Sequence, residues 1–156
     1  MILGVGNILY SDDGFGIKVV EELEKKYVFP DHITIVDGGV LGINLLGVIS
    51  HARKLIVVDT ILNKGNPGDL HRIEGNEIPN RILGKNSMHQ MDLLEALTLC
   101  RLMGNVPDTV ILGVEPENIE TLNPQLTHLI AAQVEPMVQL VLQELRNLKV
   151  MPKPAN

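Results

Sequence analysis

The sequence predicts an α/β fold, with a mainly parallel sheet between helices on both of its faces. Three apolar runs alternate with segments of helical periodicity, which is the pattern of consecutive β-α-β units. The runs span residues 1–5, 33–36 and 55–58. The third, Leu-Ile-Val-Val, is apolar at every position, as expected of a strand covered on both sides. This alternation implies parallel strands joined by right-handed crossovers. Because the strands are parallel, the carboxyl ends of all three lie along the same edge of the sheet.

The elements of the first half follow directly from this alternation. A helix is predicted from Ile17 to about Tyr27, because apolar residues recur on one face and charged residues on the other. The second strand closes on the tripeptide Asp-Gly-Gly at 37–39, and a short helix is expected over residues 41–50. The third strand ends on Asp59.

The second half of the chain is less regular. Ser87 and Gln90 match a capping box, which begins a helix and puts His89 in its first turn. The expected elements are a turn at 63–68, a candidate antiparallel edge strand at 69–73, a loop at 75–85, a helix from 87 to about 103, a strand at 109–114 and a last helix at 125–148. Residues 1–148 are therefore predicted to form one α/β domain, followed by a C-terminal tail at 149–156.

Composition narrows the function classes. The net charge is -6 and no basic stripe occurs, which argues against a nucleic-acid partner. Cys100 is the only cysteine and lies in an apolar helical run, so we expect a buried, inert thiol and no disulfide. Neither a signal peptide nor a membrane-spanning apolar run is present, so we expect a cytoplasmic protein without a membrane partner.

Two adjacent carboxylates, Asp12 and Asp13, follow the first predicted strand, and Gly14 and Gly16 come next. One of the two aspartates is expected to cap the following helix, where a carboxylate favours the helix dipole. Two in succession exceed what a cap requires. The stretch therefore indicates a site at the carboxyl edge of the sheet, where ligands bind in open α/β folds.

Asp13, Asp59 and His89 form the candidate constellation. The first and third predicted strands are often neighbours in doubly wound sheets, so Asp13 and Asp59 are expected close together. One imidazole nitrogen and two carboxylates suit a divalent metal such as nickel or zinc and leave coordination positions open. Each residue alone also fits a structural role, as a cap or as a polar helix start, and no compact ligand motif joins the three.

Other chemistries find less support in the sequence. Gly4 and Gly6 lack the third glycine of a dinucleotide fingerprint, and adjacent carboxylates would repel a phosphate. No serine lies in a G-x-S-x-G elbow. An aspartic-protease pair of Asp13 and Asp59 stays open, although nothing local establishes it. The other histidines are expected at surface or satisfied positions: His32, His51, His71 and His128.

The opening stretch, Gly4-Val-Gly-Asn-Ile-Leu-Tyr-Ser-Asp-Asp-Gly-Phe-Gly16, resembles the N-terminal signature of the nickel–iron hydrogenase maturation endopeptidases. The resemblance covers nearly the whole chain in order, continuing at 37–39, 55–59, 67–68, 87–90 and 113–116. It implies a three-layer α/β sandwich with a twisted, mainly parallel sheet. It also implies an endopeptidase that removes a C-terminal extension from the hydrogenase large-subunit precursor once nickel has been inserted.

The resemblance also implies roles for single residues. The positions of Asp13, Asp59 and His89 correspond to the metal-binding residues of the family, which are thought to sense nickel already held by the substrate. Nickel would therefore come with the precursor. We take the three residues as the catalytic and metal-binding set.

Asp37, Gly38 and Gly39 are a candidate substrate loop, in which the glycines allow close approach of the substrate tail. The sequence departs from relatives at two positions. Asp13 stands where some relatives have glutamate, and its shorter side chain requires a local adjustment toward the metal. Val40 stands where relatives often have threonine, which removes a hydroxyl next to this loop.

The mechanism expected from these features is attack by water on the scissile carbonyl, activated by nickel or by one of the carboxylates. The lack of a nucleophile motif favours this over an acyl-enzyme. We expect a monomer. A non-catalytic nickel-binding chaperone with the same three ligands is the competing class, and the acidic cluster disfavours a third class, a module that binds an anionic ligand.

Overall fold

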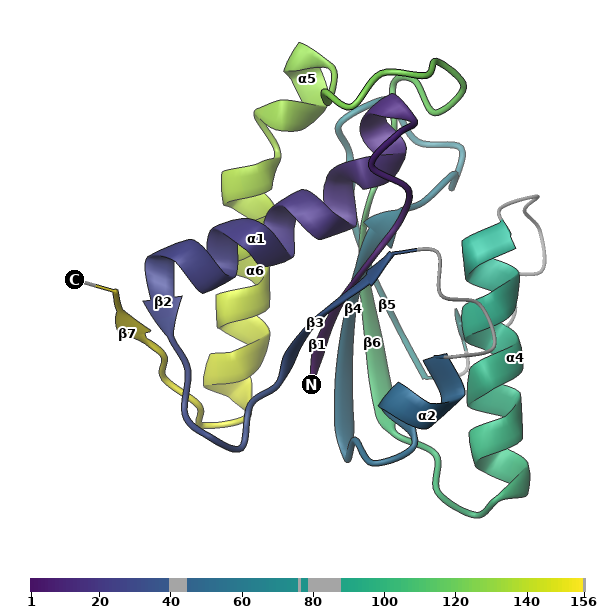
Figure 1. Ribbon diagram of the computed structural model, residues 1–156, viewed down its shortest axis with the longest axis vertical. Coiled ribbons are helices and arrows are strands. Elements are labelled where there is room, and N and C mark those ends of the chain that lie inside the picture. Colours follow the sequence, from purple (N-terminus) through teal and green to yellow (C-terminus); the bar gives the residue numbers. More distant parts are fainter. Residues whose placement is uncertain (40–44, 76, 79–87, 156) are drawn as a thin grey trace.

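The computed structural model describes residues 1–39, 45–75, 77–78 and 88–155, with the backbone alone described at 88–92 (Figure 1). Val40 and Ser87 lie outside these ranges, as do residues 41–44 of the second predicted helix and most of the predicted loop at 75–85.

Over the described ranges, the central sheet has five strands in the order β3-β1-β4-β6-β5. They are β1 (Ile2–Val5), β3 (Ile35–Gly39), β4 (Lys54–Thr60), β5 (Leu70–Glu74) and β6 (Asp108–Val114). Four strands are parallel, and β5 pairs antiparallel with β6 at the edge of the sheet. The predicted adjacency of the first and third apolar runs and the predicted antiparallel edge strand are both confirmed.

Helices cover both faces of the sheet, so the predicted three-layer α/β sandwich is confirmed (Figure 1). They are α1 (Phe15–Lys26), α2 (Leu45–Ile49), α4 (Met88–Leu102), α5 (His128–Ala131) and α6 (Val134–Asn147), with a 3-10 turn η1 (Ser11–Gly14) before α1. Helices α1 and α6 pack on one face and α2 and α4 on the other. No helix within the described ranges is long and apolar enough to cross a membrane.

Strand β4 is buried on both faces, which is why its sequence is apolar at consecutive positions. Ile56 and Val58 face the core under α1 and α6, whereas Leu55 and Val57 face the core under α2 and α4. Because side chains alternate along a strand, a strand buried on both faces needs apolar residues at every position.

Helix α1 lies directly against the strand backbone. A Cβ atom at Gly16 would collide with the carbonyl oxygens of Val5 and Val58, and one at Gly4 with the carbonyl oxygen of Gly16. This close approach fixes where α1 begins, and with it the position of the preceding loop.

The prediction of one last helix over residues 125–148 is wrong. The chain forms the short α5 and then α6, with a turn at 132–133 between them. Pro136, in the first turn of α6, has no N–H to donate to the carbonyl of Ala132, and its ring would clash with that carbonyl in a continuous helix.

The segment at 149–156 contains β7 (Lys153–Pro154), which pairs antiparallel with β2 (Tyr27–Val28). The N–H of Ala155 donates to the carbonyl oxygen of Lys26 (2.8 Å). These bonds hold the predicted tail against the end of α1.

Candidate functional site

The loop between β1 and α1 is tightly folded beyond the carboxyl end of β1. Gly6 has a φ of 138°, and a Cβ there would collide with the carbonyl oxygen of Asp13. Ser11 has a φ of 43°, a left-handed conformation that a non-glycine residue seldom adopts. The turn therefore has a defined shape that presents Asp12 and Asp13 in different directions.

Asp12 is a structural carboxylate. Its side chain is fully buried and accepts hydrogen bonds from the backbone N–H groups of Glu117 (3.0 Å), Asn118 (2.8 Å) and Thr127 (2.7 Å). The hydroxyl of Thr127 donates a fourth bond, at 3.1 Å. Asp12 thereby ties the β1–α1 loop to the segment that follows β6.

The expectation that one of the two aspartates caps the next helix is wrong. Neither η1 nor α1 has a side-chain hydrogen bond at its N-cap, and the N-cap residues are Tyr10 and Gly14. The 3-10 turn places both aspartates inside η1, so the carboxylate of Asp12 reaches a distant loop.

Asp13 is half-buried and bridges the ends of β1 and β4. Its Oδ2 accepts a hydrogen bond from the N–H of Asn7 (3.0 Å), and its Oδ1 accepts one from the hydroxyl of Thr60 (3.3 Å). Thr60 is the residue after Asp59. The structure therefore brings Asp13 to the strand end that carries Asp59, as the sequence predicts.

Asp59 is buried near the carboxyl end of β4, with 3% of its surface exposed. Its Oδ1 accepts a hydrogen bond from the N–H of Thr60 (2.8 Å). By alternation along the strand, it shares the face of Leu55 and Val57, which is the face that α4 covers.

His89 belongs to the first turn of α4, and its side chain lies outside the described part of the structure. Figure 1 shows that α4 begins at the end of the sheet where the parallel strands terminate. Within the described residues, no three His, Cys, Asp or Glu side chains are grouped to hold a metal ion. The metal role of Asp13, Asp59 and His89 stays a prediction.

The similarity of this chain to known proteins identifies its family. A family model described as hydrogenase maturation protease matches residues 17–144. The chain belongs to the hydrogenase maturation proteases. The hydrogenase 2 maturation protease of Escherichia coli (strain K12) is 39% identical over 148 residues, covering 94% of this chain and 90% of that protein. The hydrogenase expression/formation protein HupD of Bradyrhizobium diazoefficiens is 37% identical, covering 93% of this chain and 77% of HupD.

The structures agree with this membership. The hydrogenase maturating endopeptidase HybD of Escherichia coli superposes with a TM-score of 0.93 at 37% identity, covering 98% of this chain and 95% of that chain. A solution structure of an endopeptidase from Escherichia coli has a TM-score of 0.87 at 35% identity, covering 98% of this chain and 96% of the other. The protein is therefore an enzyme, a peptidase with the HybD-like α/β fold.

The Asp37-Gly38-Gly39 segment of the protease is the end of β3, where the sequence suggested a loop. Asp37 Oδ1 accepts a hydrogen bond from the N–H of Gly39 (2.9 Å), and Gly39 has a φ of 46°. The carbonyl oxygen of Gly39 accepts a bond from Gly6 (3.1 Å). The segment thus borders the turn that carries Asp13, and its role in substrate binding stays a prediction.

The sequence does not single out the pairing of the buried Glu115 with the half-buried His71 in this protease. Glu115 is 5% exposed, its carboxylate accepts the N–H of Asn63 (2.8 and 2.9 Å), and its Oε2 lies 3.0 Å from His71 Nε2. Gly113 pairs with both Asp59 and His71, so His71 lies in the same row of the sheet as Asp59. No local motif joins His71 to Glu115, because they are 44 residues apart.

Cys100 is fully buried in α4, and burial raises the pKa of its thiol. A thiol that is buried and protonated is a poor nucleophile. The prediction of a buried thiol is confirmed, and its burial argues against a role for Cys100 as a nucleophile.

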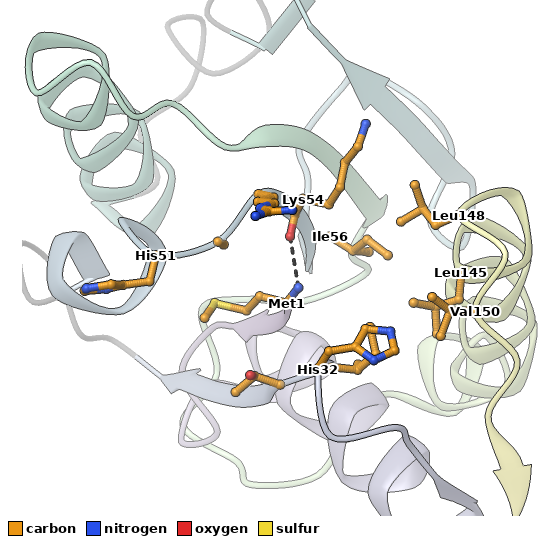
Figure 2. Close-up of a pocket in the computed structure, with 12 residues that line it drawn as sticks. Met1, His32, His51, Lys54, Ile56, Leu145, Leu148 and Val150 are labelled. Carbon is orange, nitrogen blue, oxygen red and sulfur yellow. Dashed lines mark hydrogen bonds between the residues drawn. The ribbon is translucent and has the colours of Figure 1, made fainter.

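A hollow of about 560 Å³ lies at the opposite end of the sheet, where β1 and β4 begin (Figure 2). In Figure 2 the amino group of Met1 donates a hydrogen bond to the carbonyl oxygen of Lys54 (2.9 Å). Neither Asp13 nor Asp59 lines this hollow, and no other carboxylate among the described residues does. It is separate from the candidate site.

Proposed function

We propose that this protease removes a C-terminal extension from the large-subunit precursor of a nickel–iron hydrogenase after nickel has been inserted. In this proposal Asp13, Asp59 and His89 bind the nickel that the precursor carries. The observation that supports it most is the bond from Thr60 to Asp13, which brings Asp13 to the end of β4, beside the residue that follows Asp59. The relatives named hydrogenase maturation proteases support the substrate class.

The donor set suits a metal ion held by another protein. Carboxylate oxygens bind divalent cations as well as N–H and O–H donors, so the hydrogen bonds to Asp13 and Asp59 are compatible with a role as metal ligands. Two carboxylates and one imidazole fill three positions of a borderline divalent ion and leave the others to the precursor. Binding would therefore depend on a precursor that has already received its metal.

The proposed chemistry is direct attack by water on the scissile carbonyl. Contact between the carboxylates and the nickel of the precursor would position the scissile peptide, and a carboxylate would take the proton of the attacking water. The half-buried Asp13 is accessible enough for this role, whereas Asp59 is buried and better suited to hold the metal in place. No nucleophilic side chain is needed.

The test is incubation with nickel-loaded precursor and with the same precursor lacking nickel, read by mass spectrometry. Loss of a C-terminal peptide from the loaded form alone is the expected result. Cleavage of both forms would contradict nickel gating. If the loaded precursor stays intact while nickel still binds the protease, the cleavage proposal fails.

Variants test the residue assignment. Asp13→Asn, Asp59→Asn and His89→Ala should each lower kcat/KM by about a hundredfold or more. The matched controls are Asp31→Asn and His32→Ala, because both side chains are exposed in the turn before β3, away from the candidate site. Full activity in any of the three site variants would remove that residue from the proposal, and a trapped covalent intermediate would exclude the water mechanism.

A further inference from the structure

Large apolar side chains are exposed around the candidate site. They lie on the β1–α1 loop, the β4–β5 loop, the β6–α5 loop and α5, all at the end of the sheet where the parallel strands terminate (Figure 1). We call this set the apolar rim: Ile8, Leu9, Tyr10, Leu62, Leu122 and Leu129. Their exposed fractions run from 39% for Tyr10 to 71% for Leu122. Clustered exposure of this kind marks an interaction surface.

Hydrogen bonds and contacts join the segments that carry the rim. The N–H of Asn123 donates to the carbonyl oxygen of Leu9 (2.9 Å), and the N–H of Ser11 donates to the carbonyl oxygen of Asn123 (2.6 Å). A Cβ at Gly68 would lie 3.5 Å from Cγ of Leu129, so the β4–β5 loop contacts α5. The rim is therefore held together without a ligand and is preorganised for a partner.

The rim is continuous with the candidate site in sequence and in space. The turn between Asn7 and Asp13 contains Ile8, Leu9 and Tyr10. The N–H of Asn7 donates a hydrogen bond to the carboxylate of Asp13 across this turn. Leu62 follows Asp59 by three residues. The rim therefore borders the loop that carries Asp13 and the strand end that carries Asp59.

The charge of these segments indicates the chemistry of the partner. Residues 6–14, 59–69 and 114–128 contain a single lysine, Lys64. Of their carboxylates, Asp12, Asp59 and Glu115 are buried, whereas Asp13 is half-buried and Asp69, Glu117 and Glu120 are exposed. An acidic surface with apolar side chains repels anionic lipid and nucleic acid and attracts a polypeptide that is apolar and basic.

We propose that the apolar rim docks the hydrogenase large-subunit precursor through a surface on which apolar side chains are surrounded by lysine or arginine. This inference rests on the proposed function. Docking of this kind separates affinity from chemistry, because the rim contacts the precursor while the aspartates act on the metal and the peptide bond. Loss of the rim should then raise KM and leave kcat unchanged.

The test compares two triple variants. The rim variant is Leu9→Ser, Leu62→Ser and Leu122→Ser. The matched control is Leu102→Ser, Met103→Ser and Val106→Ser, at the far end of α4, where the same kind of side chain is 80%, 66% and 51% exposed. All six side chains lie outside the buried core, and Leu122→Ser alone serves as a second rim variant if the triple variant does not fold.

The first measurement is steady-state cleavage of the nickel-loaded precursor encoded in the same genome. The second is the Kd of this precursor for protease variants that also carry Asp13→Asn, measured by calorimetry. The rim variant should raise both KM and Kd by about tenfold or more, with kcat unchanged and the control variant equal to the parent. Raising the salt concentration should weaken binding of the parent protein.

The outcomes separate the two proposals. A rim variant that binds and cleaves like the parent, or a control variant that weakens binding equally, overturns the docking proposal and leaves the cleavage proposal standing. If the parent does not cleave the precursor, the cleavage proposal fails, and the titration still decides on docking. If the Asp13→Asn protein with an intact rim shows no measurable binding in that titration, the docking proposal fails as well.

Discussion

Asp12 and Asp13 are adjacent carboxylates for which the structure predicts opposite effects of substitution. Asp12→Ala removes the acceptor of three backbone N–H groups and one hydroxyl. Each donor left unsatisfied costs about 1–3 kcal/mol, and the lower value applies because the 117–127 segment is largely exposed and water can reach part of it. We expect a loss of about 4 kcal/mol in the free energy of unfolding.

Asp13→Asn should have a much smaller effect on stability. The amide oxygen can accept the N–H of Asn7, and the amide nitrogen can donate to the hydroxyl of Thr60, so both existing contacts are kept. The expected loss is about 1 kcal/mol or less. Activity should nevertheless fall, because the carboxylate charge is gone.

The assay is urea unfolding followed by circular dichroism, together with cleavage of the nickel-loaded precursor. The pattern expected is an unstable Asp12→Ala variant and a stable, inactive Asp13→Asn variant. If Asp12→Ala stays within about 1 kcal/mol of the parent protein, the hydrogen bonds to Asp12 do not hold the loops together as argued.

Three further predictions concern packing, reactivity and charge. Gly16→Ala should lower the free energy of unfolding by about 2 kcal/mol or more, since its Cβ would collide with the carbonyl oxygen of Val58; a thermal midpoint equal to the parent's would contradict this. Cys100→Ala should keep kcat/KM within about twofold, as measured by precursor cleavage, because the buried thiol takes no part in the reaction. A hydrogen bond from Lys26 holds the pKa of the Glu135 carboxyl below its usual value of 4.5. The stability that this pair adds is therefore present above pH 4.5 and lost as the pH falls through the lowered pKa. Lys26→Met should be less stable than the parent at pH 7, with the difference disappearing in acid, and a difference that persists in acid would refute the assignment.

The fold class was predictable from the sequence because burial of a strand or helix imposes a local pattern of apolar residues. Continuous apolar runs such as 55–58 reveal strands with two covered faces, and alternation with helices specifies parallel pairing. The last helix differs from its prediction because the apolar period continues across the turn at 132–133, whereas Pro136 prevents a continuous helix there. The pairing of β2 with β7 joins two-residue strands, which leave no period to detect.

The site was predictable only in part for a related reason. Parallel strands align their carboxyl ends, so the sequence predicts that Asp13 lies near the strand end that carries Asp59, and the structure brings Asp13 to the neighbouring Thr60. The division of labour between Asp12 and Asp13 depends on partners 105 to 115 residues away, which no local spacing reveals. The pairing of Glu115 with His71 has the same origin.

The strand order has a consequence for how the chain folds. Strand β6 lies between β4 and β5, although it follows both in the sequence. During synthesis, β3, β1 and β4 can pair first, while the inner edge of β4 and the whole of β5 wait for residues 108–114. Until these arrive, both edges present unpaired backbone groups that can pair with other chains. Truncation before β6 should therefore yield a fragment that aggregates. We expect the five-stranded sheet to be completed late in the synthesis of this protease, when β6 has emerged.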